Sequence, residues 1–260
     1  MPNDTYGGRS SAWAKRAAAL YDDAYAKRYR HRDDELESSN LQLVTWLGGV
    51  CDRFDRQIDI LDLGCGTGRY FWGLRRVNSL VGLDASAAML EEARHPLHGD
   101  RLGGVPITLV RGDVMTQSFP ASSFDLVYSI GVLAEHVPLD SSVVTRVHAW
   151  LRPGGRFAFT TVHPESVSVP RTTARRGAAK ALELLPAAAT GALHRRYVGN
   201  GLYGDERWIR HVLASAFDVE SLDRFQSDVH LHGRCVARLR PEASTFAKAT
   251  ADKSARQADR

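Results

Sequence analysis

Residues 60–68 read Ile-Leu-Asp-Leu-Gly-Cys-Gly-Thr-Gly, and they decide the fold of this chain. The apolar start predicts a buried parallel strand that runs into a glycine-rich turn, with a helix beginning near Arg69. Asp62 precedes the turn, and Asp84 closes the next apolar run about twenty residues further on. In a doubly wound sheet, a glycine turn followed by an acid at the end of the next strand binds an adenosine ribose. The stretch therefore predicts a cofactor that contains adenosine.

The spacing of the glycines distinguishes between kinds of adenosine cofactor. A dinucleotide fingerprint, G-x-G-x-x-G, would require glycine at position 69, where this chain has Arg69. Gly64, Gly66 and Gly68 follow the pattern G-x-G-x-G instead. The turn therefore disfavours a dinucleotide.

Composition limits the possible classes of protein. A chain of 260 residues with 43% apolar content allows one large or two small globular domains. The three cysteines are scattered, which disfavours disulfides and a metal site and favours a cytoplasmic location. No apolar run approaches the roughly 18 residues needed to cross a bilayer, and residues 1–10 lack the apolar stretch of a signal peptide. The net charge of +4 does not require a nucleic-acid partner.

Alternating strand and helix patterns predict an α/β fold. We expect a Rossmann-like, doubly wound sheet of seven mostly parallel strands with helices on both faces. The expected strands are residues 58–63, 80–84, 107–110, 124–129, 157–162, 217–222 and 235–239. The expected helices are residues 12–30, 41–50, 87–94, 141–151 and 205–216, with another beginning in residues 70–74.

The ends of the chain and one internal segment depart from this alternation of strands and helices. Residues 1–11 and 241–260 are polar and are expected to be disordered on either side of one domain at 12–240. Residues 163–200 contain prolines and an alanine-rich helical stretch. We expect them to form a helical insertion, or lid, after the fifth strand, over the edge of the sheet where ligands bind.

Five motifs in order resemble those of class I S-adenosylmethionine-dependent methyltransferases of the type 11/25 kind. They are residues 61–68, Asp84, the segment 112–114 that contains Asp113, residues 124–129 and residues 151–155. Each motif alone is weak, but the complete series at this spacing is specific. The resemblance covers residues 41–240 and implies an antiparallel last strand and S-adenosylmethionine as cofactor.

The resemblance also implies which residues bind this cofactor. Asp84 would bind the ribose hydroxyls, Asp113 the adenine amino group and Asp62 the amino group of the methionine portion, although Asp62 could instead only cap the turn. Tyr21, Tyr25 and Tyr29 form a helical stripe that either packs on the core or covers the cofactor, and we assign Tyr29 to the pocket. The remaining predicted contacts are Gly64, Cys65, Gly66, Gly68, Ala85, Met89, Val114 and Ser129, and no metal ligand is expected.

Candidate catalytic residues follow the fourth and fifth strands. His136 is the first candidate for a general base, because in related sequences its loop lies beside the methyl group, and His163 is the second. A base is needed only when the acceptor atom carries a proton at working pH. Either histidine could instead simply bond to the backbone of its loop.

The preferred function is methyl transfer to an oxygen, nitrogen or carbon atom of a small-molecule acceptor, because an insertion over the cofactor suits a compact substrate. Nucleic-acid methylation is disfavoured, since residues 128–131 lack the Asn/Asp-Pro-Pro-aromatic segment of adenine enzymes and the cysteine of cytosine enzymes. A non-catalytic, cofactor-binding regulatory protein is a third alternative. The sequence leaves the acceptor and the oligomeric state open.

Overall fold

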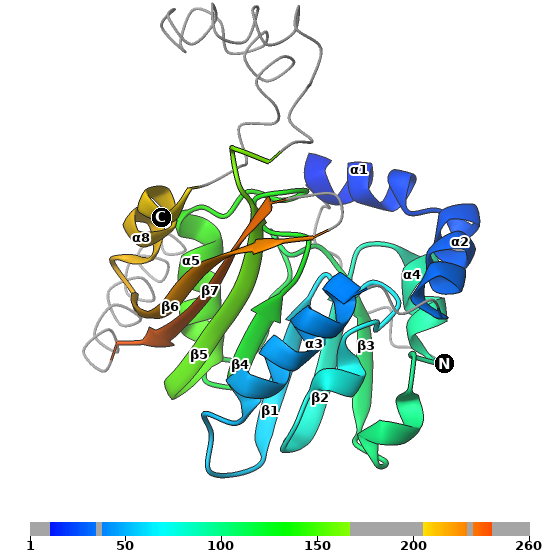
Figure 1. Ribbon diagram of the computed structural model, residues 1–260, viewed down its shortest axis with the longest axis horizontal. Helices are drawn as coiled ribbons and strands as arrows, with labels where there is room; N and C mark the ends of the chain where they lie inside the picture. The colour runs from blue at the N-terminus through cyan, green and yellow to red at the C-terminus, as the bar shows by residue number, and fades with distance from the viewer. Residues whose placement is uncertain (1–10, 35–37, 167–204, 228–230, 241–260) are drawn as a thin grey trace, which may run out of the picture.

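The computed structural model describes residues 11–34, 38–166, 205–227 and 231–240. Its strands are β1 (Ile58–Leu63), β2 (Val77–Asp84), β3 (Ile107–Arg111), β4 (Phe124–Ser129), β5 (Leu151–Val162), β6 (Phe217–Gln226) and β7 (Leu231–Leu239). Together they form a seven-stranded sheet in the order β3-β2-β1-β4-β5-β7-β6 (Figure 1). All neighbouring strands are parallel except β7, which is antiparallel to both β5 and β6. The predicted mostly parallel, doubly wound sheet with an antiparallel last strand is confirmed.

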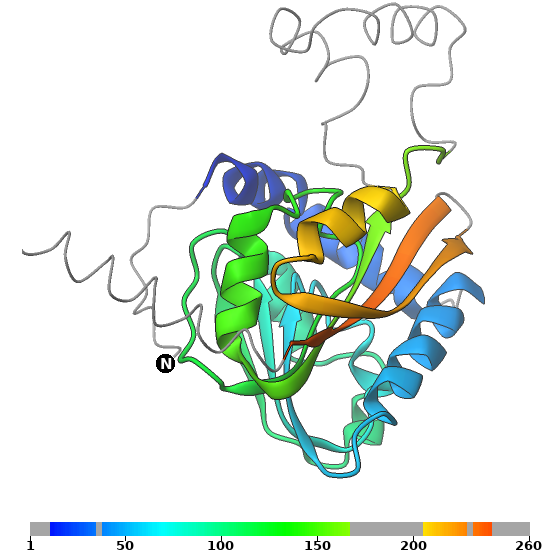
Figure 2. The ribbon, with the colours of Figure 1, turned by 90° about the vertical axis from the view of Figure 1, so that its left-hand side faces the viewer.

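Helices cover both faces of this sheet (Figures 1 and 2). One face carries α5 (Ser141–Trp150) and α8 (Glu206–Leu213). The other carries α3 (Ser38–Cys51), α4 (Ala87–Ala93) and the short 3-10 helices η1 (Phe71–Gly73) and η2 (Gly99–Leu102). Helices α1 (Ala12–Leu20) and α2 (Asp23–Asp34) cross the carboxyl-terminal edge of the parallel strands.

Alternation of side chains explains why β1 can fill both layers of the core. Ile58 and Ile60 are fully buried against the α3 face, whereas Leu61 and Leu63 are fully buried against the α5 face. Successive side chains of a strand point to opposite faces. A strand buried on both sides therefore appears as an apolar run, which in β1 is interrupted by Asp59 and Asp62.

The amino-terminal helix differs from the prediction of one continuous helix over residues 12–30. It ends at Leu20, and a second helix begins at Asp23. Tyr21 leaves the helical conformation with φ −98° and ψ 59°. Its carbonyl oxygen accepts a hydrogen bond from the Ser86 hydroxyl (2.6 Å). This tertiary bond takes the place of helix continuation and bends the segment over the sheet.

The predicted helix after the glycine turn is also wrong, because only the three-residue η1 forms there. Leu74 is already extended, with ψ 145°. Gly73 lies so close to α3 that a Cβ atom built on it would be 2.7 Å from Cγ1 of Val44. Close packing of α3 against Gly73 thus accompanies the short 3-10 helix that replaces the predicted helix between β1 and β2.

The remaining elements agree with the prediction except at their ends. β5 begins at Leu151 rather than at residue 157, because Leu151 already pairs with Phe124 of β4. The predicted disordered ends (residues 1–11 and 241–260) lie outside the described residues except for Ser11, which is the N-cap of α1. Most of the predicted insertion (residues 167–200) also lies outside the described residues. Among the described helices, none has the length and apolar character required to cross a membrane.

Asp125, near the start of β4, joins the amino-terminal ends of neighbouring strands by accepting hydrogen bonds from three groups. Asp125 is 1% exposed. Its carboxylate accepts hydrogen bonds from Arg56 (2.6 Å), from Arg152 (2.7 Å) and from the backbone N–H of Asp59 (2.9 Å). Hydrogen bonds to a buried charge contribute more than exposed ion pairs. The carboxylate therefore joins β1, β4 and β5.

We expect Asp125→Asn to lower the free energy of unfolding by about 2 kcal/mol, because a neutral amide weakens the bonds from both arginines. Urea titration followed by circular dichroism measures this change. Asp218→Asn is the matched control, since the Asp218 side chain is 63% exposed where it pairs with Arg240, and it should change the value by less than about 0.5 kcal/mol. Equal effects of the two substitutions would contradict the prediction.

Candidate active site

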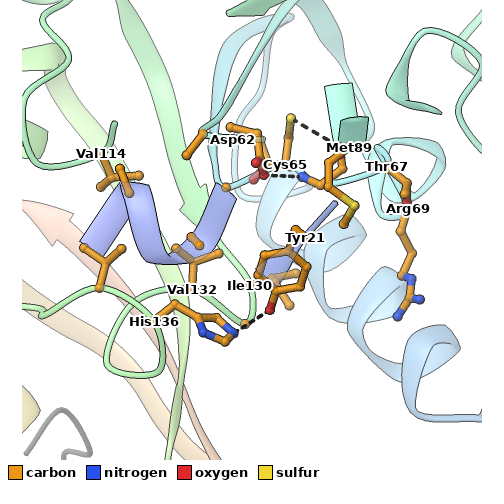
Figure 3. A pocket seen from close by; sticks show the side chains of 18 of the residues that line it. Tyr21, Asp62, Cys65, Thr67, Arg69, Met89, Val114, Ile130, Val132 and His136 are labelled. Carbon is orange, nitrogen blue, oxygen red and sulfur yellow. Dashed lines mark hydrogen bonds between the residues drawn. The ribbon is translucent and has the colours of Figure 1, made fainter. Parts of the chain in front are cut away.

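A cavity of about 100 Å³ lies at the carboxyl-terminal edge of the sheet, where β1 and β4 diverge (Figure 3). The strand order reverses between these two strands, and ligands of open α/β sheets bind at such a switch point. The ends of β1, β2 and β3 form one wall, the loop after β4 forms the second, and α1 with α2 form the third. Segments that are far apart in the sequence therefore meet around one space.

Gly64 permits the first two walls to approach each other. Its φ of +83° lies in the left-handed region, which favours glycine. A Cβ atom at this position would be 2.3 Å from Cγ2 of Val132 in the loop after β4. Any other residue here would push the glycine turn away from the opposite wall.

Asp84 is held rigidly at the end of β2. Its carboxylate accepts hydrogen bonds from the backbone N–H groups of Gly66 (2.9 Å) and Ser86 (2.8 Å). Burial raises the pKa of Asp84 even though these amides oppose the shift. A carboxylate offers about four acceptor positions, so Asp84 can accept further hydrogen bonds from a ligand in the cavity.

Asp62 is a buried acid on the same wall. It is 3% exposed, and burial raises its pKa to about 8, with the hydroxyl of Tyr128 opposing the shift. The nearby carboxylate of Asp84 contributes to this increase in pKa. A buried carboxylate ionises readily only beside a compensating positive charge. Asp62 is therefore suited to bind a cationic group in the cavity.

Tyr21 and His136 contact each other directly where they line the cavity (Figure 3). The Tyr21 hydroxyl is 2.7 Å from Nε2 of His136, and their rings meet edge to face at 5.5 Å. Oε1 of Glu135 is 3.7 Å from the same Nε2 atom, and burial raises the pKa of Glu135 to about 7. The loop after β4 thus places His136 and Glu135 beside Tyr21, the residue that follows α1.

Helix α1 is attached directly to the wall formed by the strands. The backbone N–H of Ser11 donates to Oδ2 of Asp113 (2.6 Å), while Oδ1 accepts from the N–H of Met115 (2.8 Å). At its other end, the carbonyl of Tyr21 accepts the bond from Ser86. The segment that contains α1 is therefore hydrogen bonded to the wall at both ends, and one oxygen of Asp113 is occupied by Ser11.

Most residues predicted for the site line this cavity. They are Tyr29, Asp62, Gly64, Cys65, Gly66, Asp84, Ala85, Met89, Asp113, Val114 and His136.

Three predicted site residues are placed elsewhere. The Ser129 hydroxyl donates to the carbonyl of Leu63 within the sheet (2.8 Å), and Ser129 is fully buried. Gly68 packs on Phe71 instead of facing the cavity. His163 is 2% exposed and lies between Glu206 (3.2 Å) and the backbone N–H of Glu165 (3.1 Å). The structure therefore brings His136, but not His163, to the cavity.

The sequence prediction does not assign the other lining residues to the site, although it names Tyr21 as part of the tyrosine stripe. They are Ala14, Ala17, Tyr21, Thr67, Arg69, Tyr70, Gly112, Ile130, Gly131, Val132 and Val137. Arg69 and Tyr70 directly follow the glycine turn, and this adjacency is the signal that could have indicated them. The alanines of α1 carry no comparable signal, because small residues are ordinary in helices.

Known proteins share sequence with this chain over part of its length. Residues 60–155 match a family model described as a methyltransferase domain. The chain is 33% identical over 107 residues to a sterol 24-C-methyltransferase of Debaryomyces hansenii, a match that covers 40% of this chain and 28% of that protein. It is 30% identical over 146 residues to a ubiquinone biosynthesis O-methyltransferase of Pseudomonas aeruginosa, which covers 54% of this chain and 60% of that protein. The chain thus spans less than two thirds of either relative.

A solved structure shares the fold over most of the chain. Magnesium protoporphyrin IX methyltransferase of Synechocystis, solved with bound SAH, aligns with 90% of this chain and 90% of its own, with a TM-score of 0.53. The two sequences are 17% identical. At this identity the likeness concerns the fold alone.

We expect Asp62→Asn to stabilise the ligand-free protein at pH 8, because it removes a buried acid whose native pKa lies far above the unfolded value of 3.8. Asp62 does not destabilise the native state at a pH where it is protonated in both the native and the unfolded state. The destabilisation grows as the pH rises from about 4 to about 8. The melting temperature of the variant should therefore exceed that of the wild type by at least about 2 °C at pH 8 and by less at pH 5.5.

Asp59→Asn on the same strand is the matched control. Burial raises the pKa of Asp59, but hydrogen bonds from Ser79, Asn78 and Arg152 outweigh burial and leave this pKa lowered. The control should therefore lose stability relative to the wild type as the pH rises above the pKa of the native group. Shifts of the same sign in both variants would contradict the assignment.

Proposed function

Because this chain belongs to the class I S-adenosylmethionine-dependent methyltransferase superfamily, we propose that it transfers a methyl group from S-adenosylmethionine to a small-molecule acceptor. One observation carries the proposal. Asp62, Asp84 and Asp113 surround the glycine turn at the ends of three neighbouring strands, and His136 faces them from the loop after β4. Acids for an adenosine and an amino group thus lie in one cavity with a candidate base.

The donor groups of the cavity fit this cofactor. Asp84 would accept hydrogen bonds from the ribose hydroxyls, since two backbone amides already orient its carboxylate. Asp62 would bind the ammonium group, whose charge compensates the burial that raises the pKa of this acid. Asp113 would bind the adenine amino group through the oxygen that now accepts from Ser11.

Binding would therefore require α1 to move. Pockets for ligands of this size commonly measure roughly 300–1,000 Å³, whereas the cavity beneath α1 measures about 100 Å³. Movement of α1 would break the bond from Ser11 to Asp113 and the bond from Ser86 to Tyr21. Return of the helix over the bound ligands would then exclude water from the reaction.

The residues of the chain would supply position and a proton acceptor. The bound cofactor carries an electrophilic methyl group on sulfur, so alignment of the acceptor atom supplies much of the rate. His136 would accept the proton of an O–H or N–H acceptor. Tyr21 would orient the imidazole through the 2.7 Å contact at Nε2.

Two observations support a small molecule as the acceptor. The sterol and ubiquinone methyltransferases that share sequence with this chain are named for small-molecule substrates. Helix α1 also covers the cavity at Ala14 and Ala17, which suits an enclosed acceptor better than a polymer. The atom of the acceptor that receives the methyl group would be an oxygen, a nitrogen or a carbon.

We expect Asp84→Ala to weaken S-adenosylmethionine binding at least 100-fold, because the ribose loses two charge-assisted hydrogen bonds. Calorimetric titration measures the affinity, with NAD as a ligand that should not bind and circular dichroism as a check on folding. Asp100→Ala, at an exposed position of η2, should leave the affinity unchanged. Unaltered affinity in Asp84→Ala would overturn the ribose assignment.

We expect His136→Ala to lower kcat at least about 100-fold while changing cofactor affinity less than about threefold, as is typical for loss of a general base. Tyr21→Phe should lower kcat by about tenfold, because the imidazole loses one orienting contact. The assay follows release of S-adenosylhomocysteine with the best acceptor from a panel of small phenols, amines and carboxylic acids. His163→Gln, outside the cavity, is the control and should keep the wild-type rate, whereas equal losses in both histidine variants would exclude His136 as the base.

A further inference from the structure

The hydroxyl group of Tyr128 is a buried polar group to which neither the fold nor the proposed reaction gives a role. Tyr128 lies on β4 and is fully buried. Its ring packs among apolar side chains on the α3 face of the sheet, which include Leu47 and Val50 of α3 and Leu126 of β4 (Figure 1). The hydroxyl makes no hydrogen bond of good geometry with any described residue. A buried hydroxyl without a partner is destabilising, so its presence requires an explanation.

Asp62 is the direct neighbour of Tyr128 across two parallel strands, because the register of β1 and β4 pairs these residues. Alternate residues of a strand share a face. Ile60 and Leu126, two positions earlier on their strands, are both buried on the α3 face. The side chains of Asp62 and Tyr128 therefore point to that face as well. Asp62 lines the cavity, and the tyrosine is buried in the core next to it.

The ionisation state of Asp62 determines whether the Tyr128 hydroxyl has a strong acceptor. Burial raises the pKa of Asp62 to about 8, and the hydroxyl opposes this increase. At neutral pH the acid of the empty protein is therefore mostly protonated, and a neutral carboxyl group is a weaker acceptor than a carboxylate. Other titratable groups near this pair are Asp84 on β2, Cys65 in the glycine turn and Cys51 on α3. None of these three can carry a positive charge, so the charge that favours ionisation of Asp62 has to come from elsewhere.

We propose that Tyr128 is a positioning residue for the cofactor, whose hydroxyl donates a hydrogen bond to the Asp62 carboxylate when the ammonium group of the cofactor binds to that carboxylate. This inference rests on the proposed function, because it concerns the same ligand. The ammonium group supplies the positive charge that permits Asp62 to ionise, and the proton of Asp62 is released to solvent. The carboxylate then accepts from the ligand and from Tyr128 at the same time, which fixes its orientation.

Two structural roles for Tyr128 are the competing explanations. If the ring only fills the core, removal of the hydroxyl leaves ligand binding unchanged. If the hydroxyl stabilises the empty fold, its removal lowers the melting temperature and weakens every ligand of the cavity equally. The proposed role differs from both, because it concerns only ligands that carry an ammonium group.

The test compares S-adenosylhomocysteine with 5′-methylthioadenosine, which lacks the amino-acid portion, by calorimetric titration of the full chain. Tyr128→Phe keeps the ring and removes only the hydroxyl. We expect this variant to bind S-adenosylhomocysteine about tenfold more weakly at pH 7 and 5′-methylthioadenosine within twofold of the wild type. The melting temperature of the empty variant at pH 6 should equal or exceed that of the wild type, because an unpartnered buried hydroxyl has been removed.

Thr161→Val is the matched control. Thr161 on β5 is buried, and its hydroxyl likewise has no hydrogen-bond partner in the part of the chain that the structure describes. It does not line the cavity. The control should therefore leave both affinities within twofold of the wild type.

A double-mutant cycle shows whether Tyr128 acts through Asp62. We expect Asp62→Asn alone to weaken S-adenosylhomocysteine binding at least about 30-fold, because the ammonium group loses its carboxylate. In that background Tyr128→Phe should change the affinity by less than about twofold, since the acceptor of its hydrogen bond is already absent.

Proton release gives a readout that a structural role would not change. Calorimetry in buffers of different ionisation enthalpy measures the protons released on binding, and the value for 5′-methylthioadenosine is subtracted from that for S-adenosylhomocysteine. At pH 8, near the pKa of Asp62 in the empty protein, the wild type should release about half a proton by this difference. Tyr128→Phe should release closer to one proton, because loss of the hydroxyl raises the pKa of Asp62 in the empty protein.

The possible failures are distinct. Unchanged affinity of Tyr128→Phe for S-adenosylhomocysteine, or equal weakening of both ligands, would overturn the inference. A further loss when Tyr128→Phe is added to Asp62→Asn would also overturn it, as would a proton release equal to that of the wild type. The proposed function would survive each of these results. If the wild type bound neither ligand, the proposed function would fail together with the inference.

Discussion

The hydrogen bonds from the backbone of Gly66 and Ser86 to Asp84 determine the geometry of the whole site. They join the glycine turn after β1 to the end of β2 and hold the carboxylate between them. Ser86 then caps α4, because its hydroxyl accepts from the N–H of Met89. The same hydroxyl donates to Tyr21, and Tyr21 in turn contacts His136. Through this series of bonds, one carboxylate positions the turn, a helix, the cover of the cavity and the candidate base.

Three buried acids in or beside the cavity oppose stability of the empty protein. Burial raises the pKa values of Asp62, Asp84 and Glu135, which means that each is costly to ionise in its present surroundings. The buried Asp125, which lies outside the cavity, has compensating positive charges, because its carboxylate accepts hydrogen bonds from two arginines. Such a contrast is typical of sites whose charges are completed by a ligand.

The sequence predicts the sheet well because each strand is specified by local apolar runs and by turn residues that neighbouring segments do not alter. β1 and β4 match their predicted limits, and Ser86 is the helix cap that its hydroxyl suggests. Two helix predictions fail because of tertiary contacts that have no local signature: the bond from Ser86 that ends α1 at Tyr21, and the approach of Val44 to Gly73. Among the candidate site residues, Ser129 is buried in the sheet because its hydroxyl bonds Leu63 rather than facing the cavity. The contact of Tyr21 with His136 joins positions so distant in the chain that spacing along the sequence gives no indication of it.

The place of β7 in the sheet has a consequence for synthesis of the chain. β7 lies between β5 and β6 although it is made after both of them. While a ribosome is still producing residues 231–239, the backbone groups of β5 on that side have no strand to pair with. An exposed strand edge is a site for mispairing with other chains. Closure of the sheet must therefore wait for the last described strand, so that a chain truncated before residue 231 would carry the complete glycine turn yet retain an aggregation-prone edge.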